Sequence, residues 1–153
     1  MGFRRGCYLI SVAVVYAALA SSAYSQISAS ANKAKTTNLG PISVLQGVYT
    51  MEQANRGQLV IADVCSKCHG GDLLGLDIVP AITGKWWWRS VTLSSLFRYV
   101  SNYMPWNAPN SLTRQQYIDT IAYMLWFTGY PPGSEELPSD TNLLDTIRVE
   151  VLP

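Results

Sequence analysis

The clearest chemistry in this chain lies in two cysteines three positions apart with a histidine directly after them: Cys65, Cys68 and His69. This Cys-x-x-Cys-His spacing is typical of covalent haem attachment, in which both thiols add to vinyl groups of the porphyrin and the imidazole binds the iron. Residues three and four apart share one face of a helix, so all three side chains can point at one haem. A structural disulfide or half of a zinc site is the alternative for such a pair. The 153-residue chain holds only three cysteines and one histidine, so the pattern does not arise from a cysteine-rich background.

The second iron ligand cannot be another histidine of the same chain, which leaves methionine, lysine, water or nothing. Met51 lies about three helical turns ahead of the cysteines, which is too far from the iron. Met124 falls within a predicted helix, where core packing is the ordinary role of methionine. Met104 immediately precedes Pro105, which favours an extended backbone and places the thioether on a loop. We therefore expect Met104 to be the axial ligand.

Histidine and methionine together would fill both axial positions of the iron. A neutral thioether favours ferrous iron, so this pair raises the reduction potential relative to two imidazoles. With no open position for oxygen or peroxide, the site suits single-electron transfer better than catalysis. The alternative is a haem enzyme or gas sensor in which Met104 is displaced. Gas-binding four-helix cytochromes usually carry their Cys-x-x-Cys-His near the C-terminus, whereas here more than half of the chain follows it.

Three helices are predicted to position these groups. The first spans residues 51–64, begins with a capping box and delivers the haem motif at its end. The second runs from a cap at Thr92 to about residue 103, and the third spans residues 113–128, with a loop over residues 72–84 before them. Gly57 inside the first helix costs stability unless another helix approaches closely there.

The N-terminal 25 residues have the pattern of a secretory signal peptide: a basic start, an apolar run over residues 7–20 and small residues at Ala23 and Ser25. The run is short for a membrane span, and membrane contact is expected only if the segment stays uncleaved as an anchor. Cleavage removes Cys7 and leaves no cysteine for a structural disulfide. We expect an exported, periplasmic protein.

The remaining chain is long enough for one small domain. We expect a linker or extended lead-in over residues 26–46, the domain over 47–133 and an acidic tail over 134–153. Apolar residues alternate with charged ones over residues 147–151, so this tail can dock along the domain as a strand.

Several segments resemble class I c-type cytochromes, and more narrowly the single-haem domains associated with periplasmic quinoprotein dehydrogenases. They are Gly47–Gly57, Cys65–Gly70, Val79–Gly84, Thr92–Phe97, Met104–Pro105 and Tyr117–Tyr123. The resemblance covers about Gly47 to Leu137. It implies an all-α cytochrome c fold, with three main helices and long loops wrapped round one haem c that is covalently attached through Cys65 and Cys68.

The resemblance also implies roles for residues around the haem. The carbonyl of Pro80 would accept the Nδ1 hydrogen of His69 and fix the ring, and Gly57 and Tyr123 would lie where the first and last helices cross. An indole N–H such as that of Trp88 could bond a haem propionate, although packing against the haem edge or the core explains this tryptophan equally well. The chain departs from the family pattern at three positions: Ile61, Thr120 and Asn110.

The expected function is that of a periplasmic carrier that moves one electron from a dehydrogenase to an oxidase or another cytochrome. An obligate cytochrome subunit of a dehydrogenase complex is the alternative. Without the two arginines of the signal segment, the eleven basic residues become nine against ten acidic ones, so the mature chain is near neutral. Nothing in this balance suggests nucleic acid binding, and we expect apolar contact more than charge to recognise the partner.

Overall fold

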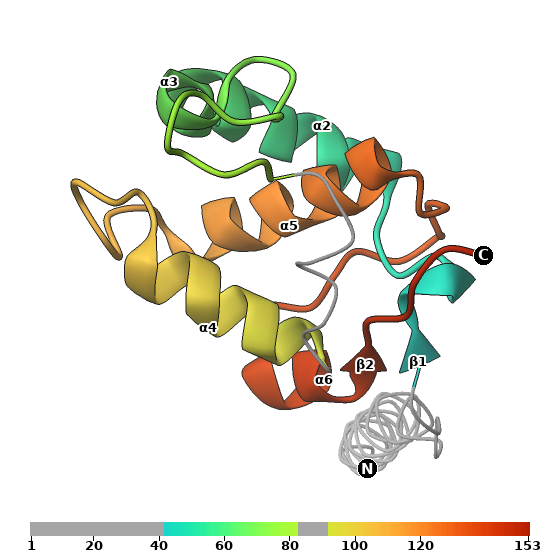
Figure 1. Ribbon diagram of the computed structural model, residues 1–153. Coiled ribbons are helices and arrows are strands. Elements are labelled where there is room, and N and C mark those ends of the chain that lie inside the picture. The colour runs from blue at the N-terminus through green and yellow to red at the C-terminus, as the bar shows by residue number, and fades with distance from the viewer. Residues whose placement is uncertain (1–41, 83–91) are drawn as a thin grey trace, which may run out of the picture. The chain divides into compact units, whose positions relative to one another are not determined.

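The computed structural model describes residues 42–82 and 92–153, and helices dominate this part of the chain (Figure 1). The elements, in order, are β1 Ile42–Ser43, the 3-10 helix η1 Val44–Gln46, α2 Met51–Val60, the π-helical segment η2 Ile61–Cys65, α3 Ser66–His69, α4 Leu93–Tyr103, α5 Arg114–Thr128, α6 Thr141–Asp145 and β2 Ile147–Arg148. The predicted all-α class is confirmed. The predicted signal segment and Trp88 lie outside the described residues. No helix within residues 42–82 and 92–153 is long and apolar enough to span a bilayer.

Side-chain caps fix the starts of the three main helices, as the sequence predicts. The Thr113 hydroxyl accepts from the backbone N–H of Gln116 at 3.2 Å, and the Gln116 side chain accepts from the Thr113 N–H at 2.8 Å, which completes a capping box on α5. At α2, Thr50 accepts from the Gln53 N–H at 3.1 Å, but the reciprocal bond is not made. Of the capping box predicted there, only the bond to the Thr50 hydroxyl is present, because the Gln53 side chain bonds the backbone of Leu137 instead.

The first helix is not continuous up to the haem motif. Regular α-helix ends at Val60, and η2 opens a π turn in which the Ser66 N–H bonds to the carbonyl of Ile61. A π turn inserts one residue relative to α-helical spacing and so rotates everything that follows about the helix axis. The two cysteines and the histidine are thus presented by a separate short segment, α3 and the last residue of η2.

Helices α2 and α5 cross at Gly57. A Cβ at this position would lie 1.9 Å from the backbone oxygen of Asp119, so only glycine allows the approach. This confirms the prediction that a second helix comes close to Gly57. Tyr123, one turn further along α5, is buried. Figure 1 shows α5 between α2 and α4, so it is the element against which both other main helices pack.

A polar network borders this crossing. Arg56 donates two hydrogen bonds to Asp119, at 3.0 and 3.1 Å, and two to Glu136, each at 2.9 Å. The hydrogen bonds that Arg56 donates to Glu136 and, next, to Asp119 raise its pKa above the usual range. The network ties α2 both to α5 and to the segment that follows α5.

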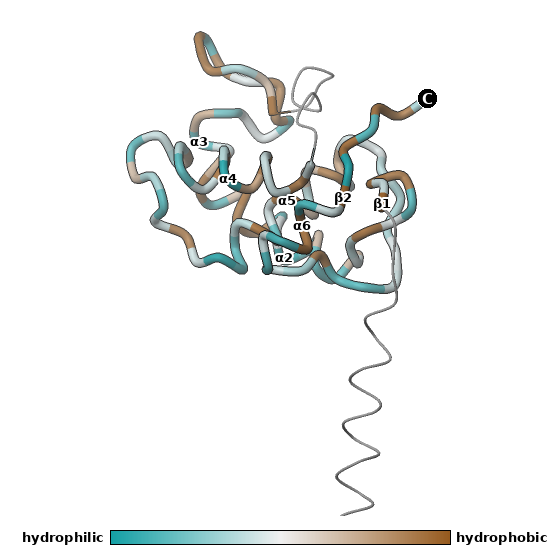
Figure 2. Tube along the Cα trace, turned by 90° about the horizontal axis from the view of Figure 1, so that it is seen from below, coloured by the Kyte–Doolittle hydropathy of each residue, from teal (hydrophilic) through white to brown (hydrophobic). Residues whose placement is uncertain are grey.

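The two ends of the described chain pair with each other. Strands β1 and β2 are parallel, with Ile42 opposite Ile147 and Ser43 opposite Arg148, and Figure 2 shows them side by side. The strand predicted in the tail is present over two residues. Residues 42–46, for which the sequence predicts a linker or extended lead-in, instead form β1 and η1, and the fully buried Val44 is part of the core. Helix α6 has no counterpart in the sequence prediction.

Candidate functional site

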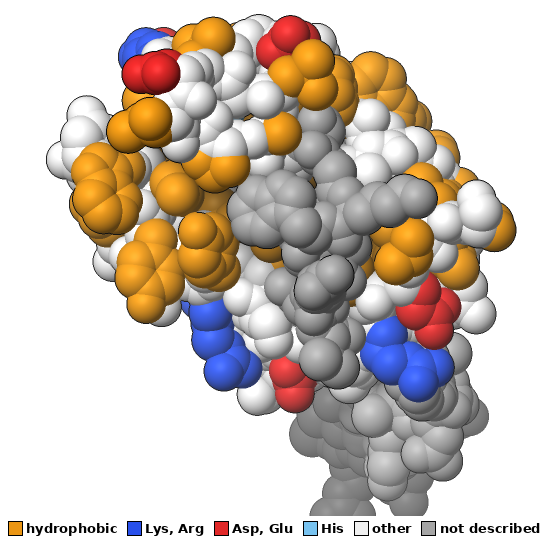
Figure 3. Space-filling model, in the orientation of Figure 1, with side chains coloured by type: hydrophobic (Ala, Val, Ile, Leu, Met, Phe, Trp, Pro, Cys, Tyr) orange, Lys and Arg blue, Asp and Glu red, His pale blue; other side chains and the backbone are white. Residues whose placement is uncertain are grey.

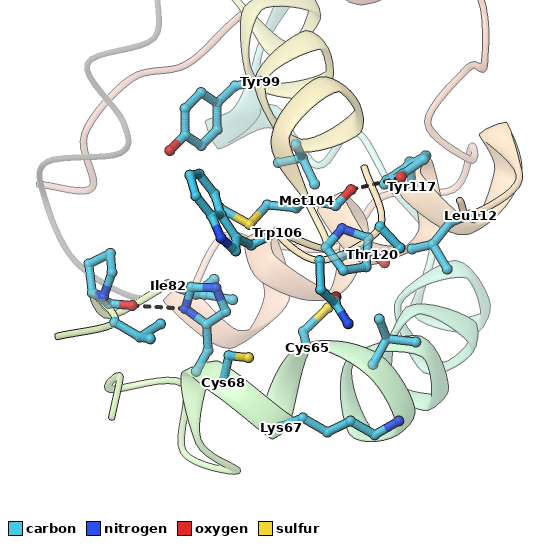
Figure 4. Close-up of a pocket in the computed structure, with 18 of the residues that line it drawn as sticks. Cys65, Lys67, Cys68, Ile82, Tyr99, Met104, Trp106, Leu112, Tyr117 and Thr120 are labelled. Carbon is cyan, nitrogen blue, oxygen red and sulfur yellow. Dashed lines mark hydrogen bonds between the residues drawn. The ribbon is translucent and has the colours of Figure 1, made fainter. Parts of the chain in front are cut away.

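One apolar cavity of about 720 Å³ brings the predicted haem-binding groups together (Figure 4). Cys65, Cys68, His69, Pro80 and Met104 all line it. Its volume falls within the roughly 300–1,000 Å³ that is usual for cofactor sites. Figure 4 shows Met104 reaching into the cavity from the side of α4, across from the helical segment that carries Cys65 and Cys68. Residues far apart in sequence therefore meet at one site.

His69 is oriented by the loop that follows it. Its Nδ1 lies 2.8 Å from the carbonyl oxygen of Pro80, which is the contact that the resemblance implies. A carbonyl can only accept, so Nδ1 carries the hydrogen and Nε2 is left as the nitrogen that can bind a metal. The loop turns back toward the helix because Gly75 adopts a φ of 89° and donates its N–H to the His69 carbonyl at 2.9 Å. A Cβ on Gly75 would lie 2.2 Å from the Val79 oxygen, so this turn needs glycine.

Cys65 and Cys68 are both free thiols. Burial, and to a lesser extent the neighbouring Cys68, raises the pKa of Cys65 to about 11, so this thiol is neutral near pH 7. The zinc alternative finds no support, because within the part of the chain that the structure describes no group of three His, Cys, Asp or Glu side chains is arranged so that it could hold a metal ion. Two thiols and an imidazole at one wall of an apolar cavity suit haem c.

Met104 is held through its own backbone. It ends α4 in the extended conformation predicted from Pro105, with φ −122° and ψ 148°, and its N–H donates to the Val100 carbonyl at 2.9 Å. Its carbonyl accepts from the phenol of Tyr117 on α5 at 2.8 Å (Figure 4). The loop after Met104 returns to α4 through Asn110, which has a φ of 60° and donates its N–H to the Ser101 carbonyl at 3.0 Å. Asparagine tolerates this left-handed geometry, so the departure from the family's glycine leaves the loop intact.

Several residues that line the cavity were not predicted from the sequence to do so. Tyr99 and Trp106 are aromatic and exposed, and Tyr117 and Thr120 are buried on α5. Trp106 stands two residues after Met104, and this proximity is a signal that could have drawn attention to it. Tyr117 was recognisable only as a tyrosine on the apolar face of the last helix, because the acceptor of a buried phenol is not visible in sequence.

The composition of the cavity fits haem c. Its lining is mainly aliphatic and aromatic, as a porphyrin face requires. Besides the thiols, the imidazole and the thioether discussed above, the polar side chains that line it are those of Tyr99, Tyr117, Thr120, Lys67, Asn107 and Ser111. The thiols and the imidazole are carried by η2 and α3, and the thioether is carried by the residue that ends α4. The residues present therefore supply both attachment points and both candidate iron ligands.

Comparison with known proteins agrees with this geometry. Residues 52–124 match the family model described as cytochrome C oxidase, cbb3-type, subunit III. No curated protein and no solved structure shows significant similarity to the chain. The match spans α2, the haem motif, α4 and most of α5. It supports a class I c-type cytochrome domain, a fold that binds haem c and transfers electrons.

Proposed function

We propose that this protein is an exported, periplasmic single-haem cytochrome that carries one electron from a dehydrogenase to an oxidase or another cytochrome. The observation that carries the proposal is the convergence of Cys65, Cys68, His69 and Met104 on one apolar cavity. The two cysteines would attach the haem covalently, and His69 and Met104 would bind the iron. When bound in this way, haem c exchanges single electrons at a higher potential than a bis-histidine haem.

The chain's own residues favour a closed site. The Pro80 carbonyl holds the His69 ring in one tautomer. The N–H and the carbonyl of Met104 are both hydrogen-bonded, so the backbone that carries the thioether is held in place. A site with both axial positions taken supports electron transfer over the peroxidase or gas-binding alternatives. The name of the matched family refers to an oxidase, which is in keeping with an oxidase or cytochrome on the acceptor side.

An apolar rim beside the cavity suits a transient redox partner. We define it as two exposed residues, Ile78 and Trp106. Ile78 and Trp106 are 91% and 81% exposed and also line the cavity. Figure 3 shows hydrophobic side chains at several places on the face it displays, including a group on the left, with charged side chains at the top and in the lower part. Electron-transfer partners form small interfaces, and one built on this rim would depend little on salt.

The test of the ligand set starts from the haem-loaded protein. Denaturation in acid should leave the haem on the chain if Cys65 and Cys68 hold it, and Met104→Ala should lower the reduction potential and let the ferrous form bind carbon monoxide. Met51→Ala is the matched control, since Met51 lies in the first turn of α2 and does not line the cavity. Rapid, stoichiometric carbon monoxide binding by the wild-type protein would contradict the carrier function.

The partner is tested separately. Purification from periplasmic extract should give a free cytochrome that a dehydrogenase reduces in solution, with a rate that changes little between low and moderate salt. Stable co-purification with a dehydrogenase would instead support the obligate-subunit alternative. Loss of reduction in moderate salt would show that charge, and not the apolar rim, recognises the partner.

A further inference from the structure

We propose that Tyr117 is a positioning residue for Met104: its buried phenol bonds the Met104 carbonyl and so keeps the thioether in the cavity. The inference rests on the proposed function, because it takes Met104 to be the axial ligand. It concerns a different element, since Tyr117 belongs to α5 and Met104 to the end of α4.

The Tyr117 side chain has little freedom to move away from the Met104 carbonyl. The side chain is 1% exposed, and its Oη lies 2.8 Å from the Met104 oxygen. The ring is fixed by an edge-on contact with Phe97 of α4, with centroids 6.4 Å apart and planes at 89°. A phenol with so little freedom holds its acceptor at a defined place, and that acceptor is the backbone of the proposed ligand itself.

The bond also completes the support of the loop. On the N-terminal side, the Met104 N–H is bonded to Val100 within α4, and on the far side Asn110 is bonded to Ser101, also within α4. Both of these bonds tie the loop to α4 alone. Among the hydrogen bonds that Met104 makes within residues 42–82 and 92–153, the Tyr117 bond is the one that reaches α5. Losing it would leave a carbonyl that has no partner while the loop is closed, and so would favour the open loop.

An external ligand measures this closed-to-open balance. Imidazole can bind the iron only in the open state, in which Met104 has moved away from it. The apparent affinity for imidazole is therefore proportional to the fraction of molecules in the open state. A neutral hydrogen bond has a net value of about 1 kcal/mol, which corresponds to about a fivefold change in an equilibrium constant. Tyr117→Phe in the oxidised, haem-loaded protein should therefore bind imidazole about five to ten times more tightly than wild type.

Tyr49→Phe is the matched control. Tyr49 is likewise fully buried, and its phenol donates to a backbone carbonyl, that of Tyr130, at 2.6 Å, but it does not line the cavity. It should lower the unfolding free energy without changing the imidazole affinity. Unchanged imidazole affinity in Tyr117→Phe, or an equal increase in Tyr49→Phe, would overturn the inference, because either result means that the bond acts on global stability only.

A second variant covers the case in which Tyr117→Phe does not fold. Fluorotyrosine incorporated at position 117 keeps the shape of the ring and makes the phenol a stronger donor, so it should weaken imidazole binding; unchanged or tighter binding would contradict the inference. Met104→Ala separates the two proposals. If that variant leaves the reduction potential and spectrum unchanged, the proposed ligand fails, whereas an effect of Met104→Ala with none at Tyr117 removes only the positioning role.

Discussion

Replacing Gly57 with alanine tests how closely α2 and α5 cross in the part of the fold that leads to the proposed haem-binding segment. The added Cβ would lie 1.9 Å from the Asp119 oxygen and 2.5 Å from its carbonyl carbon. Ordinary contact begins at 3.4 Å, so α2 and α5 would have to separate by about 1.5 Å at this point. Both obstructing atoms belong to the backbone of a helix, so no side chain can rotate away to make room.

The expected cost follows from two opposing effects. Alanine favours helix over glycine by about 1 kcal/mol. Overpacking costs about 1–3 kcal/mol where side chains can adjust, and we expect the upper end or more against a rigid helix backbone. The net result is a decrease of about 2 kcal/mol or more in the free energy of unfolding, a large share of the total for a domain of this size.

The assay is urea unfolding of the oxidised, haem-loaded protein followed by far-ultraviolet circular dichroism. Gly71→Ala is the control, because it is the same chemical change two residues after His69 and its Cβ would meet nothing within 4 Å. Gly71→Ala should stay within about 0.5 kcal/mol of wild type. A Gly57→Ala protein that unfolds at the same urea concentration as wild type, or at a higher one, would refute the close crossing.

Three further perturbations have expected outcomes. Burial raises the pKa of Tyr49 to about 12, so its phenol ionises at a lower pH in the unfolded chain than in the folded protein. The unfolding free energy should therefore fall as pH rises from about 10 to 12. In urea titrations over this pH range, Tyr49→Phe should show a smaller fall than wild type. Gln53→Leu should cost about 2–4 kcal/mol by urea unfolding, because it leaves the N–H and carbonyl of the buried Leu137, bonded to Gln53 at 2.7 and 3.2 Å, without partners; a cost below about 1 kcal/mol would contradict this. Asn110→Gly should be tolerated, whereas Asn110→Val should raise the imidazole affinity of the oxidised protein severalfold, since a β-branched residue resists a φ of 60°; equal affinities in the two variants would count against the loop geometry.

The sequence was most informative where a local rule determines the structure. Threonine caps mark the starts of α2, α4 and α5, and the proline after Met104 ends α4 in extended geometry. The glycine at position 57 had to have a helix against it, and it does. These features depend on neighbouring residues or on one steric exclusion, and such rules need no knowledge of the rest of the fold.

Other features depend on partners that are distant in sequence. The sequence predicts that Gln53 completes a capping box, but its amide bonds the backbone of Leu137. The N–H and carbonyl of Leu137 are buried and need hydrogen-bond partners, whereas a second bond at the start of α2 is not required. The π turn of η2 left no mark in the apolar pattern, which is compatible with a continuous helix. The alternation over residues 147–151 predicts β2, but its partner β1 is only two residues long and lies more than 100 positions away, so the sequence carries no signal for the pairing.

Helix α5 is the element that relates the two walls of the cavity. On one side, its backbone at Asp119 meets Gly57 of α2, the helix that leads through η2 to Cys65, Cys68 and His69. On the other, Tyr117, only two residues earlier, bonds the carbonyl of Met104. The two contacts therefore lie within one helical turn, and the distance between the walls is set over a short, rigid piece of α5. A change at the crossing should disturb both walls, whereas loss of the Tyr117 phenol should release only the wall that carries Met104.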